Sequence, residues 1–214
     1  MSDYEVTPSA VINTADQLLQ KGLDIINLGH KAFDLISNLG MDHNWVVKQF
    51  NNVVRTLNSF TDEMNQLFTT VSYSIPINLS NTANIYAQAN DEVVTTINAN
   101  EPSLLETIIP PQTESPDTII YHQSIIEETI NEFTSTVQSL QDTIQDYQST
   151  YIALVSGNWV GEAMESWTNT LNEFLSTAFD LSDIMNKTVT TQASDASNAL
   201  ATAEKINTSN VSMN

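Results

Sequence analysis

Three histidines and 26 carboxylates are the side chains of this 214-residue chain best suited to acid–base or metal chemistry, because it has no cysteine. A di-iron site in a helical bundle needs inward carboxylates and Glu-X-X-His pairs on two helices. None of His30, His43 and His122 follows a glutamate by three residues. Glutamates cluster within residues 127–132, where a helix should begin and where acidic side chains favour solvent and the helix dipole. The sequence therefore predicts no metal site and no cofactor.

Nucleophilic catalysis also lacks a pattern to support it. Serines are abundant, but the chain has neither a Gly-X-Ser-X-Gly elbow nor a glycine-rich phosphate loop. His43 follows Asp42 in a predicted turn, where we interpret it as a polar loop residue. We therefore expect no catalytic residues, and a protein that works by recognition and not as an enzyme.

The charge is strongly acidic. The chain has six lysines and arginines and 26 acidic residues, for a net charge of −20, and residues 56–186 contain no lysine or arginine. Nucleic acids and anionic membrane surfaces are bound by clustered lysine and arginine. Both partners are therefore disfavoured, and the acidic surface should keep copies of the protein apart in solution.

Apolar residues spaced alternately four and three apart predict long helices. Residues 126–154 carry one such heptad seam, sustained for about four repeats. A second seam follows Gly161 and spans 163–185. The first half has the same plan, with seams over 11–36 and 47–71. Each half is thus predicted to be an antiparallel helical hairpin with a short turn.

The two halves repeat each other in one register. Trp159 lies 114 residues after Trp45, and Asn-Trp-Val occurs at both places. The same shift superimposes the Thr-Leu-Asn of 56–58 on that of 170–172. We interpret the chain as an internal duplication of one hairpin.

Residues 99–117 are predicted to link the two copies. They contain four prolines, which remove backbone donors and clash with a preceding helical turn. The predicted domains are therefore hairpins over 1–98 and 118–214. One hairpin cannot bury both of its apolar stripes, whereas two can close a core face to face. The expected fold class is all-α, with two antiparallel helical hairpins packed as a four-helix bundle.

Three residues inside the predicted helices need an explanation. Pro76 should kink its helix or break it near Ser74 and Ile75. Gly22 and Gly29 lie seven apart on one seam, and each costs about 1 kcal/mol relative to alanine inside a helix. We expect these glycines to allow close approach of a neighbouring helix.

The turn Trp159-Val160-Gly161 lies between two helical runs. Glycine suits a tight reversal, and a large ring can cap the open end of a bundle. A Trp-X-Gly turn inside a duplicated hairpin resembles the WXG-motif family, the early-secreted-antigen-like substrates of type VII secretion in Gram-positive bacteria and mycobacteria. The resemblance spans about residues 8–98 and 118–208. It implies helical hairpins that pair into four-helix dimers and export without a cleavable signal peptide. The start of the chain, MSDYEVTPSA, has no signal-peptide pattern, and no apolar run is long enough to span a membrane.

The family has a second element, Tyr-X-X-X-Asp/Glu, near the end of its second helix, which the secretion machinery reads. The first copy here has Tyr86, with Asp91 one place later than the family spacing. The second copy has Glu204 at the right spacing but Leu200 in place of tyrosine. The first copy also has Val47 where the family has glycine.

The losses in the two copies are complementary. In family heterodimers, the Trp-X-Gly turn of one subunit lies near the Tyr element of the other. We therefore hypothesise that the Tyr element of the first copy and the Trp-X-Gly turn of the second form one composite signal. The residues expected to carry recognition are Trp45, Tyr86, Asp91, Trp159, Gly161 and Glu204.

The resemblance implies a non-enzymatic protein that is made in the cytoplasm and secreted by a type VII system as substrate or export partner. Its expected partners are the type VII membrane ATPase and a co-secreted toxin or WXG-type protein. The fused pseudo-dimer is expected to be monomeric. Two alternatives remain open: a membrane-active helical-bundle toxin component, and a cytoplasmic chaperone or adaptor of a type VII toxin.

Overall fold

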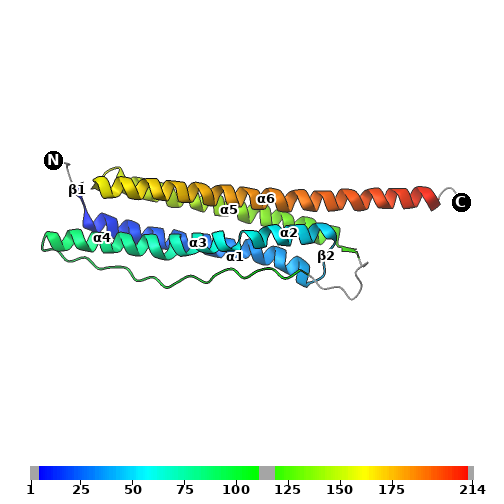
Figure 1. Ribbon diagram of the computed structural model, residues 1–214, viewed down its shortest axis with the longest axis horizontal. Helices are drawn as coiled ribbons and strands as arrows, with labels where there is room; N and C mark the ends of the chain where they lie inside the picture. The colour runs from blue at the N-terminus through cyan, green and yellow to red at the C-terminus, as the bar shows by residue number, and fades with distance from the viewer. Residues whose placement is uncertain (1–4, 111–118, 212–214) are drawn as a thin grey trace.

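A computed structural model describes residues 5–110 and 119–211. Two helical hairpins lie side by side, and the C-terminal part of the second projects beyond the bundle (Figure 1). The predicted all-α fold, two antiparallel hairpins packed as a four-helix bundle, is confirmed. In chain order the elements are β1 (Glu5–Val6), α1 (Pro8–Met41), β2 (Trp45–Val46), α2 (Lys48–Ser59), α3 (Thr61–Thr69), the π-helix η1 (Thr70–Ser74), α4 (Ile75–Ala89), β3 (Ile120–Tyr121), α5 (Gln123–Val155), β4 (Trp159–Val160) and α6 (Glu162–Val211).

The first helices of the two hairpins, α1 and α5, form the centre of the bundle. They run antiparallel, and every apolar position of the predicted seam over 126–154 is buried. Two ion pairs cross the same interface: Lys21 with Asp146 at 3.0 Å, and Lys31 with Glu132 at 2.9 Å. Burial of the two apolar seams therefore holds the hairpins together, and the ion pairs agree with this register.

The returning arms differ in the two hairpins. In the first, the helix is interrupted at Phe60 and passes through η1, whereas α6 is continuous over its whole length. The predicted seam over 163–185 includes Leu171 and Phe174; Leu171 is buried, whereas Phe174 is half-buried and packs against the edge of the core. Leu175 occupies the core position instead, and the buried row continues on to Ala196.

Pro76 neither breaks nor interrupts the helical path, but it changes the hydrogen bonding before it. The N–H of Ile75 donates to the carbonyl of Thr70, five residues back, which defines the π-helix η1. Proline has no N–H, so the carbonyl of Val71 lacks both of the donors that a helix could supply. The buried hydroxyl of Tyr147 on α5 donates to it at 2.9 Å. The proline of one hairpin is thus accommodated by a tyrosine of the other.

Replacing Tyr147 with phenylalanine should therefore destabilise the protein by about 1–3 kcal/mol, because a buried carbonyl loses its donor. The measurement is chemical denaturation of the wild type and the variant. Adding Pro76→Ala should reduce the penalty, because it restores an N–H at that position. An equal penalty with and without Pro76 would contradict this account of η1.

The same tyrosine makes stability depend on pH in the alkaline range. Burial raises the pKa of Tyr147 well above its usual value, and burial also raises the pKa of Tyr121 and Tyr151. In the unfolded chain these phenols ionise near pH 10, whereas the folded protein retains their protons. Stability is therefore present below pH 10 and falls as the pH rises past it. Tyr147→Phe should reduce this slope.

The two helical glycines face the returning arm of their own hairpin, as expected. A β-carbon at Gly22 would lie 2.5 Å from the carbonyl oxygen of Val71 and 2.8 Å from the α-carbon of Ser72. At Gly29 it would lie 2.4 Å from the ring of Phe68. Gly22 thus permits close contact of α1 with the backbone of η1, while Gly29 makes room for a ring.

The described part of the connection between the hairpins is packed against the bundle. Helix α4 ends at Ala89, and residues 92–110, which we call the strap, run without regular structure along the outside of the bundle (Figure 1). The strap begins earlier than the predicted linker over 99–117, whose residues 111–117 lie outside the described part. Its Leu105 and Ile108 are buried in the core, with 6% and 5% of their surfaces exposed.

Two asparagines fix the strap by its main chain. Asn65 accepts the N–H of Leu105 at 2.7 Å and donates to its carbonyl at 3.1 Å. Asn58, seven residues earlier, makes the same pair of bonds with Ile108, at 2.7 and 2.9 Å. These bonds involve only the backbone of the strap. Specificity for its sequence therefore comes from the buried apolar side chains of Leu105 and Ile108.

Candidate recognition elements at the two ends of the bundle

Each Trp turn is paired with the segment that precedes the first helix of the other hairpin. Strand β4 is antiparallel to β1, with Trp159 opposite Val6, and β2 is antiparallel to β3, with Trp45 opposite Tyr121. The backbone repeats the symmetry: Thr7 N–H donates to the Asn158 carbonyl at 2.9 Å, and His122 N–H donates to the Asn44 carbonyl at 3.0 Å. The two ends of the bundle are therefore built alike.

Both tryptophans are fully buried. Trp45 lies against Phe50, with ring centroids 5.2 Å apart, and meets Tyr121 edge to face at 6.5 Å. Within the described residues, neither Trp45 nor Trp159 has a hydrogen-bond partner for its indole N–H. These rings cap the core, so in this conformation a partner would meet the turn that they support and not the rings themselves.

The departure of the first copy from Trp-X-Gly has a backbone cause. Gly161 has a φ of 147°, a conformation that residues with a β-carbon rarely adopt. Val47, two residues after Trp45, has φ −144° and ψ 165°, which is ordinary extended backbone. Glycine is therefore required in the second turn and not in the first.

Tyr86 and Asp91 lie at the C-terminal end of α4. Tyr86 is half-buried, whereas Asp91 is exposed and has a φ of 57°. Asp91 N–H donates to the Gln88 carbonyl at 3.2 Å, and Glu92 N–H donates to the Ala87 carbonyl at 2.8 Å. This pair of bonds is a Schellman motif with Asp91 in the left-handed position. Asp91 thus has a structural role as a helix cap in addition to its predicted role in recognition.

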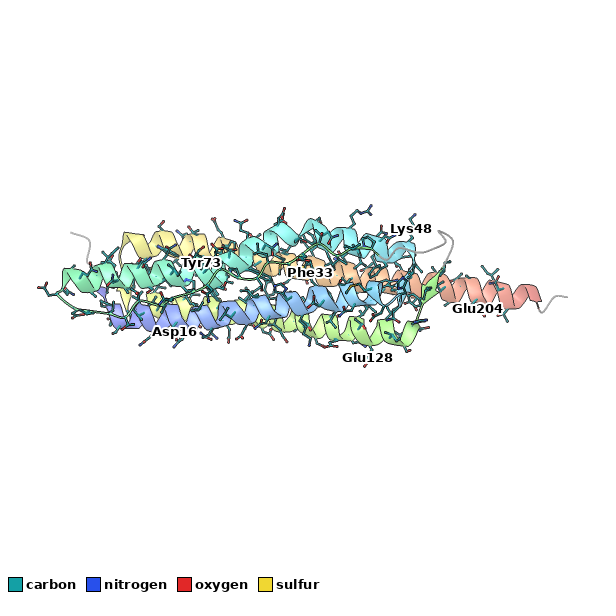
Figure 2. All side chains as sticks on the ribbon, turned by 90° about the horizontal axis from the view of Figure 1, so that it is seen from below. Asp16, Phe33, Lys48, Tyr73, Glu128 and Glu204 are labelled. Atoms are coloured by element: carbon teal, nitrogen blue, oxygen red, sulfur yellow. The ribbon has the colours of Figure 1, made fainter. Side chains whose placement is uncertain are left out.

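Glu204 lies at the opposite end of the molecule from Tyr86 and Asp91. Helix α6 passes Tyr121, whose hydroxyl donates to the Ala193 carbonyl at 3.4 Å, and then continues past the end of the bundle. Figure 2 shows Glu204 on this projecting part of α6, where its side chain is exposed. It is not in the core at either Trp turn.

The predicted recognition residues therefore divide between the two ends. The end of α4, with Tyr86 and Asp91, lies at the same end of the bundle as the turn of Trp159 and Gly161 (Figure 1). Trp45 is at the opposite end, from which the helix bearing Glu204 projects.

His43 is a helix cap as well. It has a φ of 54° after the end of α1, and its N–H donates to the Gly40 carbonyl at 3.0 Å. In residues 5–110 and 119–211, no three histidine, aspartate or glutamate side chains gather as ligands for a metal ion. Nor is any helix within those ranges long and apolar enough to cross a membrane.

The sequence did not predict the strands or the two asparagines, Asn58 and Asn65, that hold the strap. Strands β1 and β3 are only two residues long, and no periodicity can show in such short elements. The spacing of Asn58 and Asn65 by seven residues was available as a signal, since it places both amides on one face of a helix.

These observations define an all-α four-helix bundle built from two related hairpins, with a Trp turn at each end. Comparison of the chain with known protein families, with curated proteins and with solved structures finds no match in any of the three.

Proposed function

We propose that this protein is a tandem WXG-type protein, exported by a type VII secretion system as substrate or export partner. The proposal rests on the Trp-X-Gly turn of the second hairpin and the Tyr element of the first. The observation that carries it is that the two elements lie at one end of the bundle, as a composite signal requires (Figure 1). No catalytic side chain takes part, and recognition depends on the shape and charge of that end.

The chemistry of this end is that of a surface with few basic groups. Tyr86 presents a partly exposed ring, and Asp91 follows it with a carboxylate on the outside of the cap. The turn at Gly161 is held by the pairing of β4 with β1, and Asp91 is held by the cap of α4, so both elements are fixed before a partner arrives. A preorganised site loses less entropy on binding than a flexible tail does.

The experiment is to measure the protein in the culture supernatant of a Gram-positive host that carries a type VII system, with and without the membrane ATPase. A cytosolic enzyme serves as the lysis control. We expect the protein in the supernatant of the intact strain, and only at the level of the lysis control without the ATPase. Equal amounts from both strains would contradict the proposal, and retention in both cell pellets would favour the cytoplasmic adaptor.

A further inference from the structure

The duplication extends into the ends of the returning arms. Ser80 and Asn84 of α4 recur as Ser194 and Asn198 of α6, at the same shift of 114 residues that relates Trp45 to Trp159. The two serines are therefore equivalent in the sequence repeat, and their surroundings in the two hairpins can be compared.

In the first hairpin, Ser80 binds the extended strap. The N–H of Ile97, in the strap, donates to the hydroxyl oxygen of Ser80 at 2.9 Å. The side chain of Ile97 packs against the hydrophobic core, and only 1% of the surface of Ser80 is exposed. The site thus takes one backbone amide and one apolar side chain.

In the second hairpin the equivalent position is open. Ser194 is exposed and borders a cavity of about 410 Å³ between α5 and α6. Ile126 and Ile130 of α5, with 1% and 9% of their surfaces exposed, form its apolar floor, while Tyr121 and Ser197 also line it. No strap covers this face among the described residues, because the one connecting segment binds to the first hairpin.

We propose that this cavity, between Ser194 and the Ile126–Ile130 floor, binds an extended segment of a partner protein that has an aliphatic residue flanked by lysine or arginine. The aliphatic side chain would enter the cavity, and its backbone N–H would donate to Ser194, as Ile97 does to Ser80. This inference does not depend on the export proposal.

The negative charge around the cavity favours a partner segment with positive charge. Glu127 lines the cavity, and Asp195 follows Ser194 where the first hairpin has Asn81. The strap of a second copy would bring Glu92 and Glu101, five and four residues from Ile97, toward these carboxylates, and the whole chain carries a charge of −20. Repulsion therefore disfavours a second copy and favours a basic segment.

The test uses the full-length protein and the synthetic peptide KVTTINANK, which is residues 94–100 of the strap between two lysines. Binding is followed through backbone amide signals in ¹H–¹⁵N NMR spectra. We expect saturable shifts confined to residues 121–131 and 190–198. The acid-flanked peptide EVTTINANE should bind about tenfold more weakly, because its charges repel those of the site.

Variants separate this site from the rest of the surface. Ser194→Ala should weaken binding about fivefold through loss of one hydrogen bond, and Ser197→Trp should abolish it by filling the cavity. Ser139→Ala, an exposed serine of α5, is the matched control and should bind like the wild type. Thermal melting checks that each variant is folded.

Three results would overturn the proposal. The first is the absence of saturable shifts with the basic peptide, and the second is equal affinity for the Ser194→Ala and Ser139→Ala variants. The third is a set of shifts at residues 121–131 and 190–198 that appears on raising the protein concentration without peptide, because the site would then bind a second copy.

Discussion

Replacing Gly22 with alanine should lower the free energy of unfolding by about 2–3 kcal/mol, although alanine is the better helix former by about 1 kcal/mol. The added methyl group would lie 2.5 Å from the carbonyl oxygen of Val71, and neither backbone can move easily. The same carbonyl accepts the hydrogen bond from Tyr147, so displacing η1 would also weaken a contact between the hairpins. Thermal melting should show a fall of about 5 °C or more.

Two other glycines give a graded comparison. Gly29→Ala should cost less, because its new methyl group would meet the edge of the Phe68 ring, which can tilt, and not backbone. Gly157→Ala should leave the melting temperature nearly unchanged, since nothing lies within 4 Å of a β-carbon there. If Gly22→Ala raised the melting temperature, helix propensity would outweigh packing and the close contact of α1 with η1 would be refuted.

Export should fall by about tenfold in Tyr86→Ala if the ring contributes about 1.4 kcal/mol to recognition by the secretion machinery. Tyr86 is the best position for this test, because it is partly exposed at the end of a helix. Trp159→Ala is a poor choice, since removing a fully buried ring costs about 3–5 kcal/mol and would impair folding. The measurement is the secreted fraction, with the melting temperature of the purified variant beside it.

The cap allows the carboxylate to be tested separately. Asp91→Gly should keep or strengthen the Schellman motif, because glycine is the preferred residue at a left-handed position. We therefore expect Asp91→Gly to be folded and to be exported less well. Ile85→Ala, at an exposed neighbouring position, is the control and should be exported normally. Normal export of both Tyr86→Ala and Asp91→Gly would rule out the Tyr element, and with it the composite signal.

The heptad seams predicted most of the fold because burial in a helical bundle depends directly on spacing. Every predicted position from Ile126 to Leu154 is buried, and the seam of α1 is buried likewise. The prediction was less accurate at Phe174, which is only half-buried because a small difference in helix phase puts Leu175 in the core. Alternating spacings of three and four fix the face of a helix only approximately, so neighbouring apolar residues can exchange places.

The contacts that sequence could not reveal are those between distant residues without a repeating pattern. The bond from Tyr147 to Val71 depends on a register between hairpins that only packing sets. Residues 99–117, which include part of the strap, were predicted to be a linker because their prolines exclude a helix, and that exclusion says nothing about burial of Leu105. For the recognition elements, the motif placed Tyr86 and Trp159 in the chain, while their location at one end required the fold (Figure 1).

The strand pairs β1–β4 and β2–β3 at the two ends of the bundle prevent the hairpins from packing in a shifted register. A bundle with heptad seams can slip by seven residues, about 10 Å along the helix, and still bury apolar side chains. Here such a slip would separate β1 from β4 and β2 from β3 at once, because the two bridges hold opposite ends of the α1–α5 pair. The two strand pairs therefore permit only one register between the hairpins, and the Trp turns at the two ends determine it.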